Sequence, residues 1–161
     1  MRSLRPDSDR RPGIADPKPV GFLVQIDGSS LGNPGPAGIG VRIVGPDGNV
    51  VKEISRYIGT RTNNQAEYEG LLCALHESRE LGSRPVVIRT DSELIYYQMA
   101  GKYKVKNPEL KVLHSKAREL ALALPNVSIE LVRREQNKET DKLAKAAAQA
   151  ADNRPRHAQE K

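Results

Sequence analysis

The sequence predicts an α/β fold in which helices flank a five-stranded mixed sheet. Its first apolar segments are rich in β-branched residues and follow one another across short turns, which is typical of an antiparallel meander. Later in the chain, short apolar runs alternate with segments of helical period, and strands separated by helices pair in parallel. The expected order of elements is β-β-β-α-β-α-α-β-α, so a three-strand meander precedes the parallel strands.

The first half of the chain supplies the meander and the first helix. The run VGFLVQIDGSS, residues 20–30, is expected to form a strand that ends in a Gly/Ser turn. Residues 38–59 hold two β-branched runs around a Gly-Pro-Asp-Gly turn at 45–48, which predicts a hairpin. From about Asn63 to Leu81 the apolar spacing becomes helical, and Gly82 supplies a C-terminal stop.

The second half of the chain alternates strands with helices. RPVVIRTDS at 84–92 predicts a short strand, and SELIYYQMAG at 92–101 predicts a short helix closed by a glycine. The basic connector KYKVKN precedes Pro108, which suits the first turn of a helix that runs to about Leu124. NVSIELVRRE at 126–135 predicts the fifth strand, and the alanine-rich ETDKLAKAAAQAA at 139–151 predicts the last helix.

The chain has 161 residues, enough for one domain with a hydrophobic core. We assign that domain to residues 20–150. Residues 1–19 are rich in proline and charge and hold little that could be buried, and residues 151–161 have the same character. Both segments are therefore expected to be disordered tails.

Composition argues against several classes of protein. No apolar run approaches the roughly 20 residues that cross a bilayer, so no membrane association is expected. The first residues lack the hydrophobic segment of a secretory signal. Cys73 is the only cysteine, so no internal disulfide is possible. That usage fits a reducing compartment, and we expect a cytoplasmic protein.

The chain carries a net charge of +6 and has a pI near 9.5. This balance suits a polyanionic partner, and it equally suits ordinary solubility charge, so charge alone leaves both interpretations open. No glycine run is followed by Gly-Lys-Ser/Thr, which excludes a P-loop, and no small-molecule cofactor is expected. Our default for the oligomeric state is a monomer.

Four acidic residues stand where apolar residues are expected. Asp27 and Asp91 each close an apolar strand, and Asp141 lies on the apolar stripe of the last helix. Glu67 lies four residues before Leu71, on the apolar stripe of the first helix. Converging carboxylates repel one another and lose solvation, and a divalent cation removes that cost. Hard oxygen ligands suit Mg²⁺ or Mn²⁺.

Each acid also has a purely structural interpretation. Asp27 and Asp91 could be turn residues, since each precedes a small residue. Asp141 could be an acid of the first helical turn, favoured by the helix dipole.

Four local motifs, in this order and spacing, resemble the type 1 ribonuclease H family. They are DGSSLGNPGPAG at 27–38, TNNQAEY at 62–68, TDS at 90–92 and NKETD at 137–141. The resemblance covers about residues 20–150. It implies the ribonuclease H-like fold, a five-stranded mixed sheet flanked by helices. It also implies an endonuclease that hydrolyses the RNA strand of RNA/DNA hybrids and leaves 5′-phosphate and 3′-hydroxyl ends.

The resemblance implies a metal-dependent active site. The catalytic residues would be four carboxylates that together hold two Mg²⁺ ions, with Mn²⁺ as a possible substitute: Asp27, Glu67, Asp91 and Asp141. Two such ions can clamp an in-line displacement at phosphorus.

The resemblance also implies contacts with the hybrid. Asn33, Asn63 and Asn64 match positions that contact its backbone, and Thr62 matches one that holds a DNA phosphate. The turn that begins at Gly28 and Ser29 can bring backbone amides close to RNA, because glycine removes the side-chain barrier. Structural alternatives stay open here: Asn63 or Asn64 could be an N-cap, and Asn33 could be a turn residue.

Basic residues give a second set of candidate contacts. The connector places Lys102, Lys104 and Lys106 in a short edge that could bind phosphates, although a solvated linker would look the same. Many members of the family carry a histidine before the last aspartate, and LVRREQNKETD has none. We expect Arg134 or Glu135 to occupy that space, and we expect either slower turnover or a metal-coordinated water that acts as the acid. Arg134 is our candidate substrate contact.

Two rival functions fit the same fold. One is a catalytically silent module that binds nucleic acid, and the intact set of four acids argues against it. The other is a related nuclease of the integrase or resolvase type, which would lack the Asn63-Asn64 segment.

Overall fold

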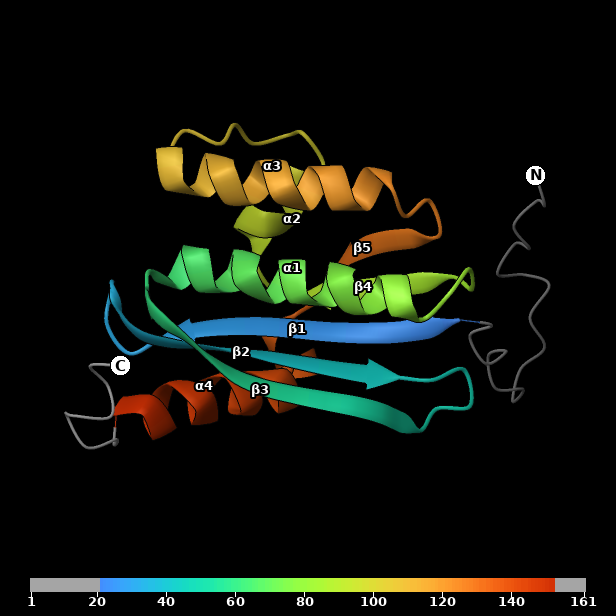
Figure 1. The fold of residues 1–161 in the computed structure, drawn as a ribbon, viewed down its shortest axis with the longest axis horizontal. Helices are drawn as coiled ribbons and strands as arrows, with labels where there is room; N and C mark the ends of the chain where they lie inside the picture. The colour runs from blue at the N-terminus through green and yellow to red at the C-terminus, as the bar shows by residue number, and fades with distance from the viewer. Residues whose placement is uncertain (1–20, 153–161) are drawn as a thin grey trace.

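A five-stranded mixed sheet forms the centre of the structure, a computed structural model that describes residues 21–152 (Figure 1). The strand order is β3-β2-β1-β4-β5. The strands are β1 (Phe22–Ser30), β2 (Gly35–Val44), β3 (Val50–Arg61), β4 (Val86–Thr90) and β5 (Val127–Leu131). The predicted tail at 1–19 and residues 153–161 of the second predicted tail lie outside the described residues.

The pairing of the strands confirms the predicted fold class. β1 pairs with β2 and β2 with β3 in antiparallel fashion, whereas β1 pairs with β4 and β4 with β5 in parallel. The hairpin turn closes where the sequence predicts it, with the Gly48 amide donating to the Gly45 carbonyl at 2.9 Å. The meander therefore supplies one half of the sheet and the crossover connections supply the other.

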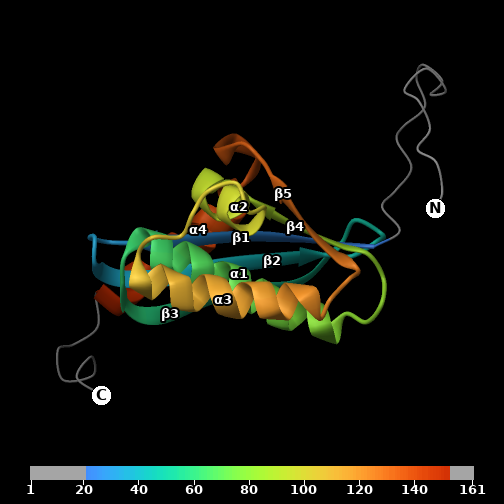
Figure 2. The same cartoon turned by 90° about the horizontal axis from the view of Figure 1, so that it is seen from above.

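Helices cover both faces of this sheet (Figures 1 and 2). On β3, the Ser55 hydroxyl donates to the Leu143 carbonyl, and the neighbouring Arg56 donates to the Cys73 thiol. Adjacent strand residues point to opposite faces, so the helices of Cys73 and Leu143 lie on opposite sides. The helices are α1 (Asn63–Glu80), α2 (Glu93–Met99), α3 (Pro108–Leu122) and α4 (Lys138–Asp152). None of these described helices is long and apolar enough to span a membrane.

The core lies between α1 and the sheet, and α3 packs on the outside of α1. Val24 and Ile26 of β1 alternate with more exposed neighbours, as the period of a half-buried strand requires. Tyr68 of α1 is fully buried, and its hydroxyl donates to the Gln98 side chain of α2 at 2.5 Å. This bond satisfies the one polar atom of the Tyr68 side chain inside the core.

The end of the fifth strand differs from the prediction. β5 stops at Leu131, and Arg134–Gln136 forms a short 3₁₀ helix, η2. Arg133 precedes it in an extended conformation, and the Gln136 side chain accepts from the Arg133 amide at 3.1 Å. This local bond turns the chain out of the sheet, so the predicted strand at 126–135 is too long.

Helix α4 approaches β2 unusually closely because glycines face it. A Cβ atom on Gly40 would lie 2.3 Å from the Thr140 carbonyl oxygen, and one on Gly38 would lie 2.5 Å from that of Ala144. The facing surface of α4 is also small, with Ala144 and Ala148 fully buried. Close packing of this helix brings its first turn to the middle of the sheet.

Gly40→Ala tests that packing, because the close approach of α4 decides whether the substitution raises or lowers the free energy of unfolding. Without a clash, the substitution would stabilise the protein by about 0.4–1 kcal/mol, because alanine has less freedom in the unfolded chain. The contact with Thr140 predicts instead a loss of about 1–3 kcal/mol in the free energy of unfolding, measured by urea denaturation. Ala146→Ser, on an exposed position of α4, serves as a control. A stabilised Gly40→Ala protein would contradict the close approach.

Candidate active site

Three carboxylates from three elements converge at one edge of β1. Asp27 lies on β1, Glu67 near the start of α1 and Asp91 directly after β4. One oxygen of each lies within 4.8 Å of the others. Asp27 and Glu67 are buried, with exposed fractions of 7% and 8%. We call this group the acidic triad.

Close contact between α1 and β1 orients Glu67. The Gly28 amide donates to Glu67 Oε1 at 2.7 Å. A Cβ atom on Gly28 would lie 2.3 Å from the backbone of Ala66, so only glycine lets the helix start this near the strand. Thr62 caps the helix: its hydroxyl accepts from the Gln65 amide at 3.2 Å, and the Gln65 side chain accepts from the Thr62 amide.

Asn137 orients Asp91, and the sequence analysis assigned it no role. Its Nδ2 donates to Asp91 Oδ2 at 3.2 Å and to the Ile26 carbonyl at 2.7 Å. Its Oδ1 accepts from the Thr140 hydroxyl at 2.6 Å. The side chain is almost fully buried. The available signal was the asparagine of NKETD, four residues before Asp141 in the motif, but nothing in the sequence shows that it would be buried.

Asp141, the fourth predicted acid, lies beside the acidic triad and is not one of its three members. It lies in the first turn of α4, is about one-third exposed and forms an ion pair with Lys145 at 3.1 Å. Hydrogen bonding with Asp141 is the smallest of the causes that raise the pKa of Asp27. The structure therefore brings three of the four predicted acids together tightly, and Asp141 acts on one of them.

The electrostatics of the acidic triad favour a bound proton or cation. Burial raises the pKa of the Asp27 carboxyl, and the negative charge of Glu67 raises it further. Burial also raises the pKa of Glu67, while its hydrogen bonds with Asp27 and the Gly28 amide and the charge of Arg134 oppose that rise. The negative charge of Asp91 adds to the rise at Glu67, so Asp27 and Glu67 are both held toward their protonated forms.

The donor set fits a divalent cation. Carboxylate oxygens are hard ligands, and within the described part of the chain these residues form the one group of three that could hold a metal ion. A cation would replace the proton that burial and repulsion otherwise favour. The geometry does not distinguish one hard divalent cation from another.

The predicted backbone-contact residues also come together. Asn33 Oδ1 accepts from the Asn63 amide at 3.0 Å, and Asn63 Oδ1 accepts from the Ser30 amide at 3.3 Å. Asn33, Thr62 and Asn64 line a polar cavity of about 200 Å³. The N-cap alternative for Asn63 and Asn64 is wrong, because Thr62 is the cap.

The turn predicted after Asp27 is wrong, because β1 continues to Ser30. Gly28 and Ser29 follow Asp27 directly on β1, where they pair with β2. Arg134 lies on η2, where it and Glu135 line a cavity of about 640 Å³ together with Asp91. The connector lysines are exposed and lie between α2 and α3: Lys102, Lys104 and Lys106.

Comparison with known proteins gives matches over most of the chain. Residues 25–147 match a family described as "Reverse transcriptase-like". The chain is 40% identical to Ribonuclease HI of Halobacterium salinarum over 76% of this chain and 61% of the relative. It is also 40% identical to a bifunctional protein of Mycobacterium tuberculosis over 80% of this chain and 36% of the relative. The chain therefore spans only about a third of that mycobacterial protein.

Two solved structures match along nearly their whole length. LC11-RNase H1, isolated from compost, has a TM-score of 0.78 and 42% identity, and the match covers 82% of this chain and 98% of that one. The same protein in complex with an RNA/DNA hybrid has a TM-score of 0.76 at 42% identity, covering 81% and 98%.

The raised pKa values predict how stability varies with pH when no metal is bound. In the folded state Asp27 and Glu67 hold protons that the unfolded chain releases above the ordinary carboxyl pKa of about 4. Their contribution to the free energy of unfolding is therefore fully present below about pH 4. It is lost as the pH rises through the raised pKa values. We expect the Tm in EDTA to fall between pH 5 and pH 8, and to recover on addition of Mg²⁺ at pH 8.

Asp27→Asn removes one of the ionisable carboxyl groups whose burial destabilises the chain at high pH. In EDTA at pH 8 it is expected to raise the Tm above that of the parent chain, and to reduce the recovery produced by Mg²⁺. Glu80→Gln, an exposed position at the far end of α1, should change neither quantity. A Tm that Mg²⁺ raises equally in Asp27→Asn and the parent would refute metal binding at the acidic triad.

Proposed function

This chain belongs to the type 1 ribonuclease H family, and on that premise we propose that it hydrolyses the RNA strand of RNA/DNA hybrids. The products would carry 5′-phosphate and 3′-hydroxyl ends. The observation that carries the proposal is the acidic triad, assembled on the fold that the chain shares with LC11-RNase H1. Sequence identity of 42% to a relative solved with a hybrid supports the substrate class.

Two Mg²⁺ ions are the proposed cofactor, with Mn²⁺ as a substitute. Asp27, Glu67 and Asp91 would hold them together with Asp141, which contributes to the raised pKa of Asp27. When bound, the two ions supply an activated water and stabilise charge on the leaving 3′-oxygen. No covalent nucleophile is needed, and the Cys73 thiol is buried on the face covered by α1.

The chain's own residues keep the carboxylates in position for that chemistry. The Gly28 amide fixes one oxygen of Glu67, and Asn137 fixes one oxygen of Asp91. Because Asn137 also bonds the Ile26 carbonyl, Asp91 is held relative to β1, the strand of Asp27. Hydrogen bonds of this kind preorganise ligands before substrate arrives.

The proposed substrate contacts use groups that can both donate and accept hydrogen bonds. An RNA strand differs from DNA by its 2′-hydroxyl, which does both. The side-chain amides of Asn33, Asn63 and Asn64 suit it. Gly28 and Ser29 are proposed as a further contact with the RNA backbone, through groups other than the Gly28 amide, which donates to Glu67. Thr62, beside Asn33 and Asn64 in the small polar cavity, is the proposed contact for a DNA phosphate.

Basic side chains would add affinity without sequence preference. We propose that Lys102, Lys104 and Lys106 contact phosphates from the connector and that Arg134 contacts the strand near Asp91. Binding should therefore weaken as salt rises. The monomeric state and the cytoplasmic location stay predictions.

A cleavage assay distinguishes the proposed activity from its rivals. End-labelled RNA/DNA hybrid, RNA/RNA and DNA/DNA are incubated with the protein, with and without Mg²⁺. We expect Mg²⁺-dependent cleavage of the RNA strand of the hybrid, absent in Asp27→Asn and Glu67→Gln and retained in Glu80→Gln. Binding of the hybrid without cleavage in either metal would favour the silent module, and equal cleavage of DNA/DNA would favour the related nuclease.

Asn137→Ala tests the positioning of Asp91. Loss of a hydrogen bond behind a metal ligand typically costs about 10–100-fold in metal affinity or activity. We expect the Mg²⁺ concentration for half-maximal cleavage to rise by about that factor, because Asp91 loses its fixed orientation. Asn126→Ala is the matched control, since its Nδ2 also donates to two carbonyls, those of Gly82 and Arg84. If both variants lose stability alike but neither shifts the Mg²⁺ dependence, Asn137 has only a structural role.

A further inference from the structure

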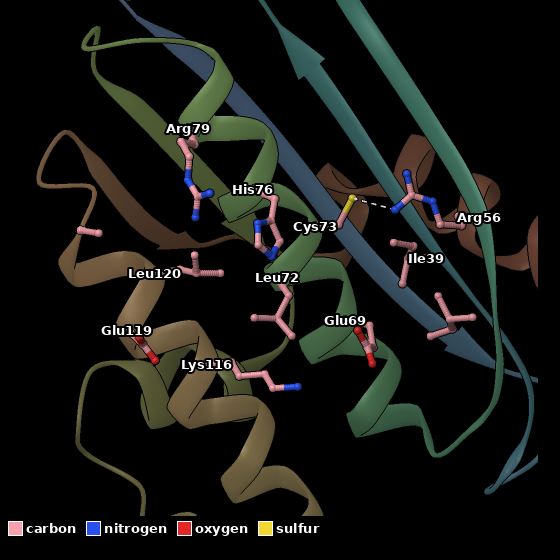
Figure 3. A pocket seen from close by; sticks show the side chains of 12 residues that line it. Ile39, Arg56, Glu69, Leu72, Cys73, His76, Arg79, Lys116, Glu119 and Leu120 are labelled. Carbon is pink, nitrogen blue, oxygen red and sulfur yellow. Dashed lines mark hydrogen bonds between the residues drawn. The ribbon is translucent and has the colours of Figure 1, made fainter.

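A third cavity lies between α1, α3 and the β2–β3 side of the sheet, and it contains no member of the acidic triad (Figure 3). Its volume is about 620 Å³. That size falls within the range of small-molecule sites, roughly 300–1,000 Å³. Nothing in the proposed nuclease chemistry uses this cavity.

The cavity combines an apolar floor with a cationic rim. Ile39 of β2, Leu72 of α1 and Leu120 of α3 are among the residues that form the floor. The rim carries three cations from three different elements, as Figure 3 shows: Arg56 of β3, Arg79 of α1 and Lys116 of α3. An apolar floor with a few convergent charges is the usual composition of a ligand site.

These cations are poorly neutralised by the protein. Among residues 21–152, neither Arg79 nor Lys116 has an ion pair or a side-chain hydrogen bond, and Arg56 donates only to the Cys73 thiol, at 3.8 Å. Burial raises the pKa of that thiol, so at neutral pH it is uncharged and does not compensate Arg56.

Two acids and a histidine also line the cavity. Glu69 lies 3.7 Å from Arg61, a cation outside the cavity, so its charge is already balanced. Glu119 is the remaining acid against three cations, and His76 is exposed. The cavity is therefore electropositive, and it favours a ligand of the opposite sign.

We propose that this cavity binds a small amphipathic anion, with its apolar body on the floor and its anionic head at the rim. Guanidinium groups bind carboxylates and related anions through paired hydrogen bonds. This favours Arg79 as the head-group contact, with Lys116 as the second cation, because Arg56 already donates to the Cys73 thiol. The apolar body would cover Leu72 and Leu120 and remove them from water. Such a ligand would touch α1, α3 and β3 together and so stabilise their packing.

Octanoate and the fluorescent sulfonate 8-anilinonaphthalene-1-sulfonate are suitable probes for the full chain. We expect the sulfonate to bind, octanoate to displace it, and octanoate to raise the Tm. The double variant Arg79→Gln/Lys116→Gln should weaken both ligands by about tenfold or more. Lys111→Gln, a lysine on α3 outside the cavity, should leave both affinities unchanged. Both sites of the double variant are exposed, and its circular dichroism spectrum verifies the fold.

Three outcomes would overturn the proposal. 1-Octanol could bind as tightly as octanoate, which would remove any role for the anionic head. The double variant could bind both probes as tightly as the parent does, which would show that the probes bind outside this cavity. An acidic peptide could bind while octanoate does not, which would make this surface a docking site for protein. None of these measurements depends on nuclease activity. The binding test can therefore fail while the cleavage assay succeeds, and the reverse.

Discussion

Mutual repulsion among buried carboxylates is the constraint on which the rest of the structure depends. Asp27 and Glu67 lie in the interior within reach of Asp91, although each of them would be better solvated at the surface. Two hydrogen bonds that a neutral core would not need hold members of the triad in place, from the Gly28 amide to Glu67 and from Asn137 to Asp91. Burial of the hydrophobic core thus offsets the electrostatic cost of burying the acidic triad.

Close backbone packing on both faces of the sheet makes this convergence possible. On one face, Gly28 lets the start of α1 touch β1, and on the other, Gly40 lets α4 touch β2. Larger side chains at either position would move a helix, and with it an acid, away from the strand. Glycine at these two strand positions therefore determines where the acids on the helices lie. The same sheet that forms the core also sets the spacing of the proposed metal ligands.

Much of this arrangement could be predicted from the sequence, and the exceptions have physical reasons. The element order follows from period and turn residues, which are local properties. The four acids stand out because each lies on an apolar stripe or at a strand end. Asn137 was missed because its role depends on contacts with residues far away in the chain, such as Ile26. The end of β5 was missed because a side-chain bond of Gln136 outweighs the strand propensity of Val132 and its neighbours.

The hydrogen bond between Asn137 and the Ile26 carbonyl joins residues 111 positions apart. Such a contact has a high contact order, and it can form only after nearly the whole domain has been synthesised. A nascent chain that ends before α4 has Asp27, Glu67 and Asp91 but no side chain to hold the last of them. Completion of the site thus coincides with completion of the fold, so a partly made chain would carry the acids without the arrangement that the proposed chemistry requires.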